Sequence, residues 1–120
     1  LTEATDAGAD VVNLSMNVTL SDYVKSGILT QAQADSYISR ADTVCQCVEQ
    51  KGAVICVSAG NEGEDIQSTC DFPASLEHVL CVGAIDENEE RSNLCSSDLL
   101  WRSTGFYSAR RKCCVRLDRV

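Results

Sequence analysis

One asparagine has the type and position of a residue that takes part in chemistry. Asn61 lies between Gly60 and Gly63, directly after the apolar run of residues 53–59. A short run rich in β-branched residues that ends at a glycine is typical of a buried parallel strand leading into a tight loop. In α/β folds, chemistry usually takes place at the carboxyl ends of such strands. The side-chain amide of Asn61 is therefore a candidate donor, and the alternative is a residue that fills a left-handed turn position.

The preceding segments predict the elements that hold this strand. Residues 11–15 are typical of another strand. Between the two, apolar residues recur at spacings of three and four, which predicts one helix from Thr30 to Lys51. Thr30 is a suitable N-cap, and Lys51 followed by Gly52 is a suitable helix end. Strand, helix and strand form a βαβ unit, and such a unit requires a parallel sheet.

The remaining segments give weaker signals. Residues 1–7 are typical of the last turns of a helix that ends at Gly8. Residues 17–29 and 64–71 are predicted as polar connections, and residues 79–86 as a third strand.

Three separate segments resemble the subtilisin-like serine proteases (subtilases). Residues 57–63, Val-Ser-Ala-Gly-Asn-Glu-Gly, resemble the oxyanion loop of that family, and residues 8–16 resemble its core-strand pattern Gly-Ala-Asp-Val-Ile-Asn-Met-Ser-Leu. Residues 72–75 resemble its Tyr-Pro-Ala segment, in which the aromatic–proline bond is typically cis. Residues 79–86 and 91–97 follow the family pattern in the same order.

The resemblance implies a three-layer α/β fold with a parallel sheet, of which this chain holds only the central βαβ portion. It covers residues 1–97, interpreted as a partial peptidase domain. Residues 98–120 depart from the family pattern and are interpreted as a divergent basic tail that contains cysteines. No signal peptide is visible, and we expect the chain to be an internal fragment.

The resemblance also implies roles for particular residues. Asn61 would donate to the oxyanion that forms when a serine attacks a peptide carbonyl. Asn17 stands where the family usually has glycine; asparagine tolerates the left-handed conformation of that turn, but its Cβ hinders close approach of a substrate backbone. The residues expected to line the substrate cleft are Ser15, Met16, Asn17, Ser58, Ala59 and Gly60.

The catalytic triad of the family has no counterpart in this sequence. The only histidine, His78, lies in Leu-Glu-His-Val rather than in a Gly-Thr-His-Val-Ala context, and no Gly-Thr-Ser-Met-Ala segment occurs. We expect His78 to be a surface residue before a strand. The parent domain is thus predicted to be a serine endopeptidase acting on polypeptides, and the isolated chain to be inactive. The alternatives are a truncated pseudo-protease that at most binds peptide and a nucleotide-binding domain. The latter lacks both G-x-G-x-x-G and a P-loop lysine.

Composition restricts the partners and the compartment. Residues 1–100 carry 4 basic and 17 acidic side chains, whereas residues 101–120 carry 6 and 1. The acidic body argues against nucleic-acid binding, and no apolar stretch is long enough to cross a membrane. Eight cysteines in 120 residues favour a secreted, oxidising setting. The missing remainder of the catalytic domain is an expected partner.

No metal or cofactor is required by this interpretation. Cys45 and Cys47 are expected to point to different sides of one helix, which argues against a shared zinc site. The family resemblance leaves calcium possible in the full-length parent. Its candidate ligands would be the backbone carbonyls of Ala74, Leu76 and Val79.

Overall fold

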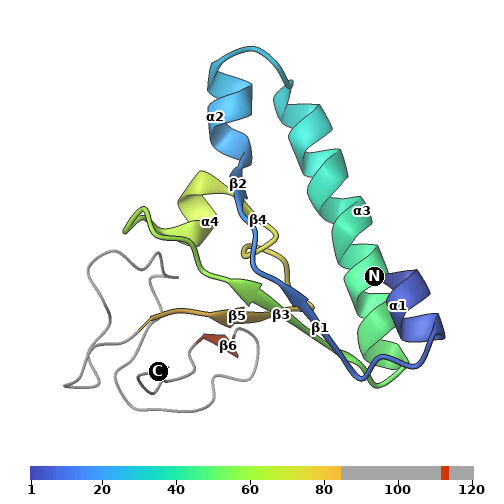
Figure 1. The fold of residues 1–120 in the computed structure, drawn as a ribbon. Helices are drawn as coiled ribbons and strands as arrows, with labels where there is room; N and C mark the ends of the chain where they lie inside the picture. The colour runs from blue at the N-terminus through green and yellow to red at the C-terminus, as the bar shows by residue number, and fades with distance from the viewer. Residues whose placement is uncertain (85–111, 114–120) are drawn as a thin grey trace.

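A computed structural model describes residues 1–84 and 112–113 (Figure 1). Its centre is a parallel sheet in the order β1-β3-β5-β6. The strands are β1 (Val11–Leu14), β3 (Val54–Ser58), β5 (Leu80–Val82) and β6 (Lys112–Cys113). The three predicted strands and their parallel pairing are confirmed. The end of the third predicted strand, residues 85–86, lies outside the described residues.

The long helix α3 (Gln31–Gln50) connects β1 to β3 and begins and ends where the sequence predicts. Its start is a reciprocal cap: the backbone N–H of Gln33 donates to Thr30 Oγ1 at 3.3 Å, and that of Thr30 donates to Gln33 Oε1 at 2.9 Å. Such a capping box satisfies two N–H groups that the helix leaves without partners. Lys51 caps the other end, and Gly52 follows with a φ of +87°.

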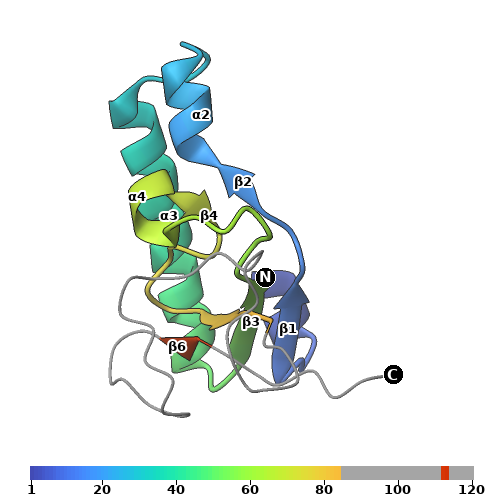
Figure 2. The ribbon, with the colours of Figure 1, turned by 90° about the vertical axis from the view of Figure 1, so that its left-hand side faces the viewer.

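The core lies between α3 and one face of the sheet (Figure 2). Cys45 and Val48 of α3 belong to the same buried cluster as Ile55 and Val57 of β3. Because side chains alternate along a strand, neighbouring residues of β3 point to the other face. There, Val54 is 44% exposed. The short helix α1 (Thr2–Asp6) ends just before Gly8 as predicted and contacts α3. The α/β class with a parallel sheet is therefore confirmed.

The predicted polar connection at residues 17–29 is wrong, because it contains a strand and a helix. The additional elements are β2 (Val18–Thr19), α2 (Leu20–Lys25), α4 (Ile66–Thr69) and β4 (Asp71–Phe72). β2 and β4 pair antiparallel in a small second sheet. The polar segment before Phe72 likewise contains α4.

The Phe72–Pro73 peptide bond is cis, as the sequence resemblance implies. Among the described helices, none combines the length and apolar character needed to cross a membrane.

Candidate functional site

The parallel register brings two predicted cleft segments to one edge of the sheet. β1 and β3 are neighbours, with Leu14 opposite Val57. Residues 15–17 leave β1 and residues 58–60 leave β3 at the same, carboxyl, edge. The six predicted cleft residues therefore share this edge, next to the loop that carries Asn61.

The loop after β3 presents Asn61 with its side-chain amide available. Asn61 is exposed, and within the described part of the chain its side chain makes no hydrogen bond. Its backbone N–H donates to Glu62 Oε2 at 2.8 Å. Positive φ angles occur at Gly60 (+87°) and Gly63 (+69°) but not at Asn61. The alternative interpretation of Asn61 as a left-handed turn residue is therefore wrong, because the two glycines adopt that conformation.

The base of this loop is anchored to the sheet. The backbone N–H of Ala59 donates to the Val82 carbonyl at 2.9 Å, and the Ala59 side chain is buried. This bond continues the pairing of β3 with β5 by one residue. Asn61 thus follows a strand end that is hydrogen-bonded on one side and packed into the core.

The segment after β1 lies at the same edge of the sheet as the Asn61 loop. The side-chain amide of Asn13 donates to Ser15 Oγ at 3.1 Å, which orients that hydroxyl. Met16 is 58% exposed. Asn17 is half-buried, and its Oδ1 atom is buried without a hydrogen-bond partner. Asn17 does not have a positive φ, so the expectation of a left-handed turn at this position is wrong.

His78 lies at the opposite edge of the sheet from Asn61. It precedes β5, whereas Asn61 follows β3, and these strands are parallel. The five residues of β3 alone correspond to about 15 Å along the strand. The ring Nδ1 of His78 lies 2.7 Å from Glu49 Oε2. His78 is partly exposed before a strand, as expected, and is too distant to act as a base beside Asn61.

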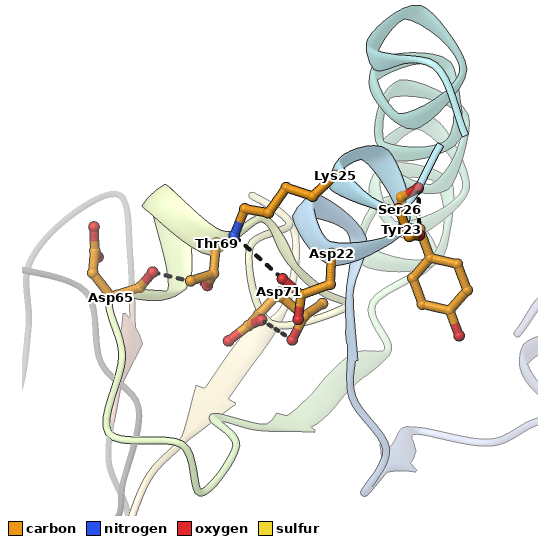
Figure 3. Close-up of polar contacts among 8 residues, drawn as sticks. Asp22, Tyr23, Lys25, Ser26, Asp65, Thr69 and Asp71 are labelled. Atoms are coloured by element: carbon orange, nitrogen blue, oxygen red, sulfur yellow. Dashed lines mark hydrogen bonds and ion pairs between the residues drawn. The ribbon is translucent and has the colours of Figure 1, made fainter. Parts of the chain in front are cut away.

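A buried carboxylate is the feature that sequence reasoning missed. Asp71 of β4 is only 1% exposed and accepts a hydrogen bond from Thr19 Oγ1 at 2.9 Å. Figure 3 shows Asp71 in the region between α2 and α4. The spacing of Leu20 and Val24, followed by Gly27, was a signal for α2. No local signal indicates that Asp71 is buried.

The described residues contain no cluster of three His, Cys, Asp or Glu side chains suited to hold a metal ion. The side chains of Ala74, Leu76 and Val79, whose carbonyls are the candidate calcium ligands, are buried and apolar. Only their backbone oxygens have the chemistry of calcium ligands. On α3, Cys45 is buried and Cys47 is exposed, so the two thiols face different sides as predicted.

The comparisons of this chain with known proteins agree with one another. The model of the subtilase family (peptidase S8) matches residues 1–115, a range that includes β6. Subtilisin DY of Bacillus licheniformis is 34% identical over 94 residues, which cover 78% of this chain and 28% of that protein. The thermophilic serine proteinase of Bacillus sp. (strain AK1) is 32% identical over 84 residues, or 70% of this chain and 16% of that protein. The chain thus spans less than a third of these relatives.

Solved structures agree on the fold. The crystal structure of a lanthipeptide protease superposes with a TM-score of 0.65 at 19% identity, covering 79% of this chain and 28% of that one. The epidermin leader peptide processing serine protease of Staphylococcus aureus superposes with a TM-score of 0.57 at 18% identity, covering 78% and 26%. At these identities the likeness concerns the fold alone.

Proposed function

Because this chain belongs to the subtilase family, we propose that it forms part of a serine endopeptidase that cleaves polypeptides through an acyl-enzyme. In the complete domain, an aspartate, a histidine and a serine outside this chain would form the triad. This chain would supply one donor of the oxyanion hole and one wall of the substrate cleft. The observation that carries the proposal is the unengaged Asn61 amide at the carboxyl edge of the sheet.

The proposed role of Asn61 follows from the charge that develops during acyl transfer. When a serine attacks a peptide carbonyl, its oxygen becomes negative, and a donor already in place stabilises that charge with little reorganisation. Two features support this role: the amide has no competing partner in the described structure, and the strand before the loop is anchored through Ala59.

Residues 15–17 and 58–60 are proposed as the two sides of the substrate cleft. Both segments leave neighbouring parallel strands at the same edge, and Met16 is exposed there. A peptide lying along residues 15–17 would have its scissile carbonyl near the Asn61 loop. This arrangement is a proposal for the complete domain.

For the 120-residue chain by itself, we propose peptide binding without hydrolysis. Its only histidine lies at the edge of the sheet away from Asn61, bonded to Glu49. A serine-directed fluorophosphonate probe is therefore expected to leave the folded chain unlabelled. Labelling that disappears on mutation of one serine would contradict this proposal.

The role of Asn61 is best tested in a chimera that restores the triad. In this chimera, residues 8–84 replace the matching segment of Subtilisin DY, and hydrolysis of a chromogenic peptide is measured. Asn61→Ala is expected to lower kcat by about 10²–10³ with little change in KM, a magnitude known from subtilisin itself. Glu64→Gln, an exposed substitution in the same loop, serves as the control. An Asn61→Ala chimera with unchanged kcat would refute the oxyanion role.

Two further expectations remain proposals. Secretion of the parent is supported by the eight cysteines, a number typical of proteins from oxidising compartments. Calcium binding by the full-length parent, through the carbonyls before β5, would be detected as a calcium-dependent rise in its Tm.

A further inference from the structure

Asp71 is the one charged residue that is buried in the described part of the chain. Thr19 Oγ1 donates to its Oδ1 atom at 2.9 Å, whereas Oδ2 is buried and has no hydrogen-bond partner there. A buried carboxylate without a compensating charge or donor is strongly unfavourable. Such an atom indicates that a group absent from this structure satisfies it.

The unsatisfied oxygens gather around one small ladder. Four described side chains have a buried oxygen without a partner, and all lie in or close to β2 and β4: Asn17, Ser21, Asp71 and Ser75. The cluster is rich in acceptors, since a carboxylate oxygen and the amide Oδ1 of Asn17 can only accept hydrogen bonds. A ligand that fits both must be a donor.

The two faces of the β2–β4 ladder have different chemistry. Val18 and Phe72 are paired and line an apolar groove against α3. Thr19 and Asp71 are paired as well and therefore point to the other face, as alternation along a strand requires. Asn17 directly precedes β2, and its Oδ1 atom is the other acceptor-only oxygen that is buried without a partner. The ladder is thus continuous in sequence with the predicted cleft segment, residues 15–17.

The lysine of α2 does not neutralise Asp71, because it pairs with another carboxylate. Lys25 of α2 bonds Asp22 at 3.3 Å, and its side chain is 74% exposed (Figure 3). An exposed ion pair of this kind is weak and remains in water. Among the described residues, no basic side chain forms an ion pair with the buried carboxylate.

We propose that Asp71, with Asn17, selects a basic side chain, arginine or lysine, of the polypeptide bound in the cleft. This inference rests on the proposed peptide cleft and adds its substrate class. The basic group would donate to Asp71 Oδ2 and Asn17 Oδ1, entering from the side of residues 15–17 because the opposite face, at Val18 and Phe72, is an apolar groove. Guanidinium and ammonium groups carry donors and no acceptors, which matches the two oxygens.

The test measures binding of two labelled peptides to the full 120-residue chain by fluorescence anisotropy. The peptides are identical except that one carries an arginine and the other carries citrulline, which has the same shape without the charge. The arginine peptide is expected to bind about 10- to 100-fold more tightly, the range for a hydrogen bond to a charged group. Asp71→Asn should abolish this ratio, and the matched Asp22→Asn, at an exposed carboxylate, should keep it.

The possible results of the binding measurement separate the selectivity from the cleft itself. Equal binding of both peptides by the unmutated chain overturns the selectivity and leaves the peptide cleft intact, and this comparison does not depend on a variant that folds. Failure of both peptides to bind overturns the proposed cleft together with the selectivity.

A second experiment compares thermal unfolding of the chain in sodium chloride and in choline chloride at equal ionic strength. A sodium-dependent rise in Tm that Asp71→Asn removes would assign the site to a small cation and overturn the proposal.

Discussion

The thiols of Cys45 and Cys47 are expected to react at very different rates, although both belong to α3. Cys45 is 1% exposed, whereas Cys47 is exposed. Burial, with a smaller contribution from the negative charge of Asp42, raises the pKa of Cys45 from 9.0 to about 11. Since the thiolate is the nucleophile, this shift lowers the reactivity of Cys45 directly.

The size of the effect follows from the ionised fraction. At pH 8, a thiol with a pKa of 9.0 is about one-tenth ionised, and one with a pKa of about 11 about one-thousandth. Alkylation of Cys45 in the folded chain should therefore be about 100-fold slower than in the unfolded chain. Restricted access of the reagent to the buried sulfur adds to this difference.

The assay exposes the chain to iodoacetamide at pH 8 for increasing times, with and without urea, followed by mass spectrometry. Both cysteines lie in the tryptic peptide of residues 41–51, so a Cys47→Ser variant isolates the rate of Cys45 and a Cys45→Ser variant that of Cys47. Without urea, Cys47 should be modified first. Modification of Cys45 at the same rate with and without urea would refute the placement of this α3 face in the core.

Two further predictions concern the buried residues around Cys45. The folded state favours the protonated Cys45 thiol, so the stabilising contribution of this thiol is complete below pH 9 and is lost as the pH rises towards 11. Urea titrations should therefore show that the free energy of unfolding decreases between these pH values. The decrease should be smaller in Cys45→Ala. Ile55→Ala should lower the free energy of unfolding by about 2–5 kcal/mol, because Ile55 is fully buried under α3. Val54→Ala, at the adjacent and exposed position, should cost clearly less, and equal losses in urea titrations would contradict the assignment of the two sheet faces.

The sequence predicts the elements whose signals are local. The helix α3 has a long apolar repeat, a capping threonine and a terminal glycine, and each of these signals acts within a few residues. The strands β2 and β4 are two residues long and exist through their mutual pairing. The Thr19–Asp71 hydrogen bond joins residues 52 positions apart, a separation that no local pattern encodes.

The same difference between local and long-range signals applies to the residues of the candidate site. Asn61 is predicted from its loop alone, because the glycines around it and the strand before it are contiguous in sequence. The position of Asn61 relative to Ser15 depends on the pairing of β1 with β3, which the βαβ pattern predicts. The sequence predicts Asp71 only as part of a polar connection, since its burial depends on the packing of α2 against β4.

Under the proposed roles of Asn61 and Asp71, peptide binding and catalysis would be separable in this chain. In its proposed role, the Asn61 amide would stabilise a charge that exists only after a serine has attacked the carbonyl, so its contribution to binding an intact peptide would be small. The proposed contact of Asp71 with a basic side chain, in contrast, forms in the ground state and needs no nucleophile. A chain without the triad would then retain selectivity for basic peptides while the oxyanion donor has no oxyanion to stabilise. Asn61 would thus serve the chemistry of the complete domain, whereas Asp71 would determine what this particular chain binds.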